Sequence, residues 1–324
     1  MLKSHSPCMF EPNLRMEEAL KTSLNTKTLT RTGQSGGGCI NQGEAYITDS
    51  RTVFVKRNKK SKSRVMFDGE LEGLKVIAAT KTVTVPEPIV VLDNPDGGAC
   101  IVMEYLEMKG LRRYHQRLGE ELAKLHLYND QLRNKPPPKD KDADSQSTLE
   151  YVKEFGFHTT TCCGYIPQEN SWCDDWVAFY ARNRLDYQIR LLAKEKGDRE
   201  ANELWSRLQL VLPRFFKDLE IRPSLLHGDL WKGNAAETKE HPVIFDPATF
   251  YGHHEYDLAI AGMFDGFNKN FYDAYHKRIP KAPGFEARHK LYTLYHYLNH
   301  WNHFGGGYRG TTLSVMRSLL KIPV

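Results

Sequence analysis

The spacing of apolar and polar residues in the first third of the chain predicts strands with one helix among them. Four short runs rich in β-branched, aromatic and aliphatic residues are predicted as strands, at residues 44–48, 52–56, 89–92 and 99–104. A three-residue connection joins the first two runs, which is hairpin spacing, and a turn with two glycines joins the last two. Residues 63–79 have helical periodicity. We therefore expect residues 16–104 to form a small lobe built on an antiparallel sheet.

From residue 105 to residue 324 the pattern is mainly helical. Amphipathic spacing predicts helices at residues 119–127, 174–196, 199–212, 256–264 and 285–304. One strand pair is expected within this half, formed by residues 224–227 and 243–246. Residues 134–148 are rich in Pro, Lys, Asp and Ser and too polar to pack, so we expect a mobile surface insertion there. Residues 1–15 read as an irregular leader. The fold class expected is α+β, with two lobes.

Composition excludes several classes of protein. The 324 residues are 40% hydrophobic and 26% charged, which is typical of a globular protein, and the chain contains no apolar stretch long enough to span a membrane. Six cysteines without a CxxC pair favour a reducing compartment, and the N-terminus lacks a secretory signal, so the cytoplasm is the expected location. The net charge of +5 and the basic run at residues 57–64, which lacks aromatic residues, do not indicate nucleic-acid binding.

The most informative segment is the sequence His-Gly-Asp-Leu-Trp-Lys-Gly-Asn at residues 227–234, followed by an apolar strand ending at Asp246. It supplies three oxygen-bearing side chains around one strand-loop-strand turn, which phosphoryl transfer requires. Asp229 would accept the proton of the attacking hydroxyl, while Asn234 and Asp246 would hold Mg²⁺ against nucleotide phosphates. Local backbone hydrogen bonds are the alternative role for Asp229. The spacing of five residues from aspartate to asparagine, as in protein-kinase catalytic loops, favours the catalytic role.

This segment resembles the aminoglycoside phosphotransferase and choline kinase branch of the protein-kinase-like fold, and more narrowly the fructosamine kinase family. The resemblance extends from about residue 16 to residue 321 and includes the strings at residues 35–40, 155–158, 161–165, 281–285 and 299–304. It implies a protein-kinase-like fold, with a small antiparallel sheet in the first lobe and a larger, mainly helical second lobe.

A kinase of this type needs further parts, which occur in the expected order. Lys56 ends an apolar strand and Glu70 follows on the next helix, as expected for a lysine that contacts phosphates and a glutamate that orients it. Glycines before that strand would allow backbone N–H groups to approach phosphates. By resemblance, the link between the lobes lines the nucleotide pocket. The ATP-binding residues expected are thus Gly36, Gly37, Gly38, Lys56, Glu70, Glu104, Tyr105 and Leu106.

The resemblance also implies the substrate and its contacts. It implies ATP-dependent phosphorylation of the C3 hydroxyl of two ketosamines, ribulosamine and psicosamine. These substrates would be attached to glycated proteins or be small molecules. Elimination of the 3-phosphate would then free the amine. Trp231, two residues after Asp229, is expected to stack on the sugar, with core packing as the alternative. Asn299 and His300 are further candidates for sugar contact. Some family members have a cysteine at the position of Cys39 that links two subunits by a disulfide. The resemblance therefore implies that this chain is a monomer or a homodimer that forms on oxidation.

Other functions remain open at this point. The chain could be a fructosamine 3-kinase proper, a choline or aminoglycoside kinase, or a redox-sensing pseudokinase that pairs through Cys39. Lost activity is disfavoured by the joint presence of five residues that a kinase of this type needs: Lys56, Glu70, Asp229, Asn234 and Asp246. His296, His300 and His303 share one face of a predicted helix, but a zinc site made of these three is not favoured, since no HExxH motif or carboxylate accompanies them.

Overall fold

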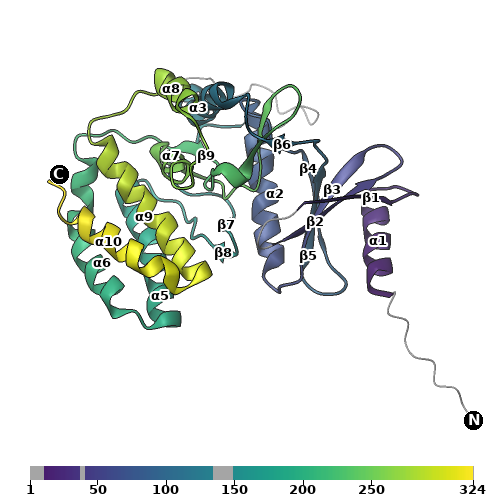
Figure 1. Ribbon diagram of the computed structural model, residues 1–324, viewed down its shortest axis with the longest axis horizontal. Coiled ribbons are helices and arrows are strands. Elements are labelled where there is room, and N and C mark those ends of the chain that lie inside the picture. The colour runs from purple at the N-terminus through teal and green to yellow at the C-terminus, as the bar shows by residue number, and fades with distance from the viewer. Residues whose placement is uncertain (1–10, 37–40, 134–148, 324) are drawn as a thin grey trace, which may run out of the picture.

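The computed structural model describes residues 11–36, 41–133 and 149–323. A five-stranded antiparallel sheet with the strand order β1-β2-β3-β5-β4 forms the first lobe (Figure 1). Its strands are β1 (Thr30–Gly36), β2 (Gln42–Ile47), β3 (Thr52–Asn58), β4 (Pro88–Asp93) and β5 (Ala99–Glu104). The two predicted hairpins are present, within one or two residues of the expected bounds. The edge strand β1 was not predicted, because its mostly exposed, polar sequence has no apolar alternation.

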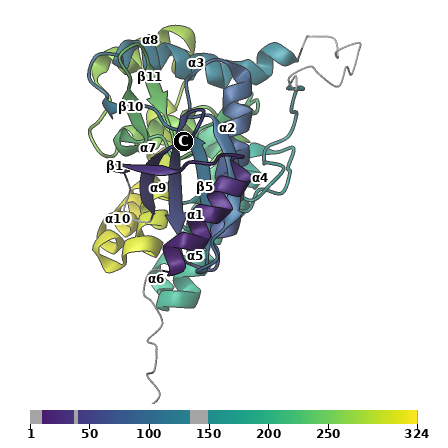
Figure 2. The same cartoon turned by 90° about the vertical axis from the view of Figure 1, so that its right-hand side faces the viewer.

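Two helices cover the opposite faces of this sheet, α1 (Glu11–Ser23) and α2 (Ser63–Thr80) (Figures 1 and 2). Strand β5 shows why both faces are covered. Ile101 and Met103 belong to the same buried cluster as residues of α2, whereas Val102, with its side chain on the other face, packs in the cluster that includes Met16 of α1. Helix α1 begins inside the segment expected to be irregular, and residues 1–10 and the expected insertion at 134–148 lie outside the described residues.

The second lobe is mainly helical. Its α-helices are α3 (His115–Leu132), α4 (Trp176–Phe179), α5 (Tyr187–Lys196), α6 (Arg199–Val211), α7 (Glu255–Ala261), α8 (Lys269–Arg278), α9 (Phe285–Phe304) and α10 (Arg309–Leu319). Helix α9 has the predicted bounds. The expected helix at 174–196 is a continuous helical run from Trp176 to Lys196, and its middle, Tyr180–Asp186, is a π-helix. No described helix is both long and apolar enough to cross a membrane.

The expected pairing of residues 224–227 with residues 243–246 is wrong. Strand β9 (Ser224–Leu226) pairs with β12 (Phe250–Gly252), and β11 (Pro242–Ile244) pairs with β10 (Ala235–Glu237). The remaining short strands are β6 (Lys109–Gly110), which extends the β10–β11 pair, and β7 (Cys162–Cys163), which pairs with β8 (Ile166–Pro167). The physical reason is local: a tight turn returns β10 directly into β11, with Thr238 N–H donating to the His241 carbonyl at 2.9 Å.

A buried ion pair fixes α7 against α9. The guanidinium of Arg288 donates to both carboxylate oxygens of Glu255 at 2.8 Å, and the two side chains are 2% and 1% exposed. Arg288 also donates to the Pro283 carbonyl at 2.7 Å, so the buried charges have hydrogen-bond partners. Helix α7 is thereby held where Asp257, two residues after Glu255, reaches the loop after β9.

We predict that Gly119→Ala destabilises the fold. An added Cβ at this position in α3 would lie 2.2 Å from the Phe271 carbonyl oxygen of α8, so the two helices would have to separate. Such overpacking costs about 1–3 kcal/mol. Equilibrium urea unfolding followed by circular dichroism measures the loss.

Gly310→Ala in α10 is the matched control, since no atom lies within 4 Å of the Cβ it would add. It should leave stability unchanged or raise it by up to about 1 kcal/mol, because alanine favours helix more than glycine does. Equal unfolding midpoints for the two variants would contradict the prediction.

Candidate active site

Residues of both lobes line a cavity of about 320 Å³. Strand β3 and helix α2 contribute from the first lobe, and the loops after β9 and β11, together with α9, contribute from the second. Eight of the residues singled out from the sequence line this cavity: Lys56, Glu70, Asp229, Trp231, Asn234, Asp246, Asn299 and His300. The structure therefore brings together side chains that are up to 244 residues apart in the sequence, between Lys56 and His300.

Lys56 lies between two carboxylates. Its Nζ atom is 2.9 Å from both carboxylate oxygens of Glu70 and 2.9 Å from Oδ1 of Asp246. The side chains of Lys56 and Glu70 are almost fully buried, whereas that of Asp246 is 37% exposed toward the cavity. The expected lysine–glutamate pair is thus formed, and the same ammonium also links β3 to the loop after β11.

The electrostatics of this group depend on all three charges. Burial lowers the pKa of Lys56, but Asp246 and Glu70 outweigh it and hold the pKa above its ordinary value. Burial raises the pKa of Glu70, an effect that the adjacent ammonium opposes. Glu70 therefore depends on Lys56 to stay ionised, because an unpaired carboxylate at this depth would take up a proton.

The loop after β9 is held in place by Asp257 from α7. One carboxylate oxygen accepts the backbone N–H of His227 at 2.8 Å and the other accepts that of Gly228 at 2.8 Å. Gly228 has a φ of 83°, and a Cβ there would lie 2.1 Å from the Ala248 carbonyl oxygen, so only glycine fits. Asp257 also contacts His126 Nε2 at 3.1 Å. Its role here is that of a loop brace.

His227 fixes the backbone of the neighbouring aspartate. Its Nε2 atom lies 3.0 Å from the Phe245 carbonyl, which can only accept, so Nε2 carries the proton. Nδ1 is then the acceptor for the backbone N–H of Asp229 at 3.2 Å. Burial lowers the pKa of His227, which keeps the ring neutral and preserves this arrangement.

Asp229 and Asn234 are joined across the turn. Asn234 Nδ2 donates to the backbone carbonyl of Asp229 at 2.9 Å and to its carboxylate at 3.2 Å. The same amide lies 3.5 Å from the Asp246 carbonyl, and its Oδ1 atom takes part in none of these bonds. Burial, followed by repulsion from Asp246, raises the pKa of Asp229 well above its ordinary value. The carboxylate therefore has affinity for a proton or a cation.

The three candidates for sugar contact differ in their freedom. Trp231 is 37% exposed and meets Phe264 edge to face at 5.6 Å, so its ring forms a cavity wall and is not core packing. His300 donates from Nδ1 to the His296 carbonyl at 2.7 Å, which leaves Nε2 as an acceptor. Asn299 is buried, and both ends of its amide are engaged, by Gln188 at 3.2 Å and by the Cys163 thiol at 3.1 Å.

The other expected nucleotide contacts lie outside this cavity or outside the described residues. The backbone N–H of Glu104 donates to the Glu87 carbonyl at 2.8 Å and that of Tyr105 to the Thr52 carbonyl at 3.4 Å. The N–H of Leu106 has no such partner within the described part of the chain. Gly36 lines a neighbouring hollow beside β2 and β3. Gly37, Gly38 and Cys39 lie outside the described residues.

Comparison with known proteins assigns the family. A family model for fructosamine kinase matches residues 14–322. The chain belongs to the fructosamine kinase family. Among curated relatives, the mouse ketosamine-3-kinase is 55% identical over 309 residues, covering 94% of this chain and 100% of the mouse protein. A chloroplastic protein-ribulosamine 3-kinase of Arabidopsis thaliana is 39% identical over 308 residues, covering 95% of this chain and 88% of the plant protein.

Solved structures support the fold. A Haemophilus somnus protein provisionally named a fructosamine-3-kinase superposes with a TM-score of 0.74 at 24% identity, covering 94% of this chain and 96% of its own. Choline kinase LicA of Streptococcus pneumoniae gives a TM-score of 0.57 at 13% identity, covering 94% and 99%. The α+β fold with two lobes of the kinase-like type, expected from the sequence, is thereby confirmed.

Two residues of this fructosamine kinase family member escaped the sequence-based site. Cys163 of β7 lines the cavity, as Asp229 does, and His296 of α9 lies close to both of these side chains. Neither has a spacing signal that relates it to Asp229, which is 66 residues from Cys163 and 67 from His296. His300 and His303 donate from Nδ1 to helix carbonyls one turn back, and the described residues contain no cluster that joins either of them to His296.

We predict a pH-dependent stability loss in Asp257→Asn. Burial raises the pKa of Asp257, but His126 and the backbone N–H of Gly228 outweigh it and hold the pKa below its ordinary value. The ionised group thus stabilises the fold above its unfolded-state pKa of about 3.9, and the contribution is lost as pH falls through the folded pKa. At neutral pH the variant should lose about 1.5–3 kcal/mol of unfolding free energy.

Urea unfolding at several pH values tests this. The difference from wild type should be constant between about pH 7 and pH 5 and should shrink below about pH 4. Asp174→Asn, at an exposed position, is the control and should stay within about 0.5 kcal/mol of wild type throughout. A deficit that grows on acidification would contradict the brace.

Proposed function

We propose that this chain is an ATP-dependent ketosamine 3-kinase, which transfers a phosphoryl group to the C3 hydroxyl of protein-bound ketosamines. The observation that carries the proposal is the convergence of Lys56, Asp229, Asn234 and Asp246 on one cavity, in a chain 55% identical to mouse ketosamine-3-kinase. Ribulosamine and psicosamine are the ketosamines proposed, with fructosamine as the alternative. Elimination of the 3-phosphate would free the amine, so the activity would deglycate proteins in the cytoplasm.

Nucleotide binding is assigned to the first lobe. Lys56, oriented by Glu70, would contact the α- and β-phosphates, and Gly36 to Gly38 would approach them with backbone N–H groups. Between the lobes, the N–H of Glu104 is already engaged by Glu87, so the N–H of Leu106 is the backbone donor left for adenine. Glu104 and Tyr105 would then line the pocket through other atoms.

The residues present fit Mg²⁺. Repulsion between Asp229 and Asp246 raises the pKa of Asp229, and one ammonium faces three carboxylates in this cavity, so negative charge is in excess. The Asp246 carboxylate and the Oδ1 atom of Asn234 would hold the metal, since oxygen ligands of this kind suit a hard cation. Bound there, Mg²⁺ supplies neutralisation of the charge on phosphate oxygens.

Asp229 is proposed as the base. The C3 hydroxyl oxygen forms the bond to the terminal phosphorus while the bond to the ADP oxygen breaks, and the hydroxyl proton passes to the Asp229 carboxylate. The Asn234 amide donates to this carboxylate, and His227 accepts the backbone N–H of Asp229, so the side chain and the backbone of Asp229 are both held in place. Trp231 would stack on the sugar and Nε2 of His300 would accept from a sugar hydroxyl.

For Asn299 a role through Cys163 fits its engaged amide better than direct sugar contact.

Redox-dependent dimerisation through Cys39 stays a prediction. Non-reducing gels of wild type and Cys39→Ala, with and without oxidant, test it. Loss of the covalent dimer in the variant is the result expected, and an unchanged dimer would refute the assignment.

We predict that Asp229→Ala binds ATP normally but loses most of its turnover. The substitution removes the proton acceptor and leaves the Lys56 group intact, so the rate should fall by at least about 10²-fold. ATP- and Mg²⁺-dependent phosphorylation is measured on matched lysine peptides carrying ribulosamine, psicosamine or fructosamine, with choline and kanamycin as further acceptors.

Lys56→Met is the companion variant and should weaken ATP binding itself. Turnover by wild type on a ketosamine peptide is the expected result, and the order of the three sugars identifies the preferred substrate. Turnover on choline or kanamycin alone, or near wild-type rates in Asp229→Ala, would overturn the proposal.

Trp231→Ala should raise the KM for a ketosamine peptide by about tenfold while leaving the KM for ATP unchanged, because a stacking contact of about 1–1.5 kcal/mol is lost only on the acceptor side. Steady-state kinetics with each substrate varied in turn measure both constants. Trp172→Ala is the control, since this similarly exposed indole does not line the cavity. An equal effect of both substitutions, or a shift in the KM for ATP, would argue against a role in acceptor binding.

A further inference from the structure

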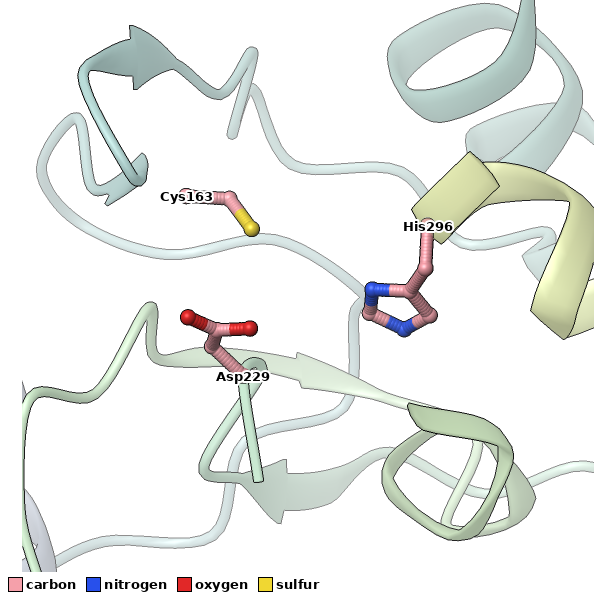
Figure 3. A group of neighbouring side chains, drawn as sticks. All are labelled: Cys163, Asp229 and His296. Atoms are coloured by element: carbon pink, nitrogen blue, oxygen red, sulfur yellow. The ribbon is translucent and has the colours of Figure 1, made fainter. Parts of the chain in front are cut away.

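Cys163, Asp229 and His296 come from three separate parts of the second lobe and point toward one another (Figure 3). Cys163 belongs to β7, Asp229 to the loop after β9, and His296 to α9. One Sγ, one carboxylate oxygen and one ring nitrogen lie within 4.8 Å of one another. Cys163 and Asp229 line the cavity, so the space between the three side chains adjoins it.

His296 is the unusual member of this group. It is fully buried, yet neither Nδ1 nor Nε2 has a hydrogen-bond partner among the described residues. A buried ring nitrogen without a partner costs stability, and such groups are rare in native proteins. The ring centroids of Tyr256 and Tyr295 lie 5.2 and 5.1 Å from that of His296, so these rings pack against the imidazole without accepting or donating a hydrogen bond to it. Burial lowers the pKa of His296 to about 3, so the ring is neutral and has a lone pair to offer.

The cysteine is held in a matching position. Asn299 Nδ2 lies 3.1 Å from Sγ, and Gln188 in turn holds Asn299, so the thiol is fixed from behind. Burial, and then the Asp229 carboxylate, raises the pKa of Cys163, so the thiol stays protonated. In this state the group is a protonated thiol, a carboxylate and a neutral imidazole, with one negative charge among them.

The donor set selects a particular kind of cation. Thiolate and imidazole favour Zn²⁺ over Mg²⁺, which requires oxygen ligands. Ligand atoms around tetrahedral zinc lie about 3.5 Å apart, so side-chain movements of about 1 Å would close the present arrangement. On binding, the Cys163 thiol would release its proton to solvent. The charges of thiolate, carboxylate and Zn²⁺ would then cancel, which suits a buried position.

We propose that Cys163, Asp229 and His296 form a Zn²⁺ site that inhibits phosphoryl transfer by occupying the Asp229 carboxylate. The fourth coordination position would face the cavity, because two of the three ligands line it. The inhibition rests on the proposed function of Asp229, but the binding of zinc does not. Free zinc would thus act on the proposed kinase at a place distinct from the Asn234 and Asp246 side chains.

Metal binding is measured first, on the full chain with excess Mg²⁺ and a phosphine reductant that does not bind zinc. Competition with a chromophoric chelator should give one Zn²⁺ per chain. Substitution with Co²⁺ should give the thiolate-to-cobalt charge-transfer absorption in the near ultraviolet. Cys163→Ser and His296→Gln should each weaken zinc binding by more than about tenfold, since even the partners of metal ligands contribute that much. Cys162→Ser, next in the sequence, should bind zinc as wild type does.

Phosphorylation of a ketosamine peptide is then followed at increasing zinc, with each variant normalised to its own zinc-free rate. Inhibition should occur at the concentrations that fill the site in wild type and Cys162→Ser, and should shift upward at least tenfold in Cys163→Ser and His296→Gln. If His296→Gln does not fold, Cys163→Ser and the cobalt spectrum decide alone.

Two results would overturn the site: a cobalt complex without thiolate absorption, or equal zinc inhibition of wild type and Cys163→Ser. Zinc bound through Cys163 in a protein without kinase turnover would instead refute the proposed function and leave the site in place.

Discussion

The arrangement of the active cavity depends on one buried ammonium group. Lys56 comes from the sheet of the first lobe, and it meets Glu70 of the adjacent helix and Asp246 of the second lobe at 2.9 Å each. A charge at this depth is stable only with partners, and the loss of one partner leaves the others uncompensated. The Lys56 ammonium therefore holds strand β3, helix α2 and the loop after β11 at fixed distances from one another, and so links the two lobes.

In the second lobe, a buried carboxylate is paired with backbone N–H groups instead of with an ammonium. The loop that carries Asp229 has two adjacent N–H groups, of His227 and Gly228, that must be satisfied away from water, and Asp257 accepts both. Asp257 can do so because α7 is anchored to α9 through the Glu255–Arg288 pair two residues earlier. The position of the proposed base is thus determined by helix packing remote from the cavity, which local sequence around Asp229 does not reveal.

This difference explains what the sequence could predict. Strands β2 to β5 and helix α2 of the first lobe follow from their apolar spacing and turn residues, and α9 likewise has apolar residues at helical spacing. The residues proposed for phosphoryl transfer follow from motif spacing. Edge strand β1 lacks an apolar pattern, and the partners of β9 and β11 depend on a turn and on strands of three residues, too short for periodicity to detect. Cys163 and His296 could not be related to Asp229, since only the tertiary fold brings β7 and α9 to the same loop.

The possible metal ligands near Asp229 are of two kinds, hard oxygen donors and softer sulfur and nitrogen donors. Asn234 and Asp246, which line the same cavity, offer oxygen atoms, whereas the sulfur of Cys163 and a ring nitrogen of His296 lie within 4.8 Å of an Asp229 carboxylate oxygen. The raised pKa of the Asp229 carboxylate reflects both burial and the nearby charge of Asp246. Hard and soft cations would therefore seek different neighbours of the same carboxylate. The burial that raises the pKa of the proposed base also places its carboxylate near a thiol and near an imidazole that has no hydrogen-bond partner among the described residues. The metal that binds there would therefore depend on which of these neighbours it recruits.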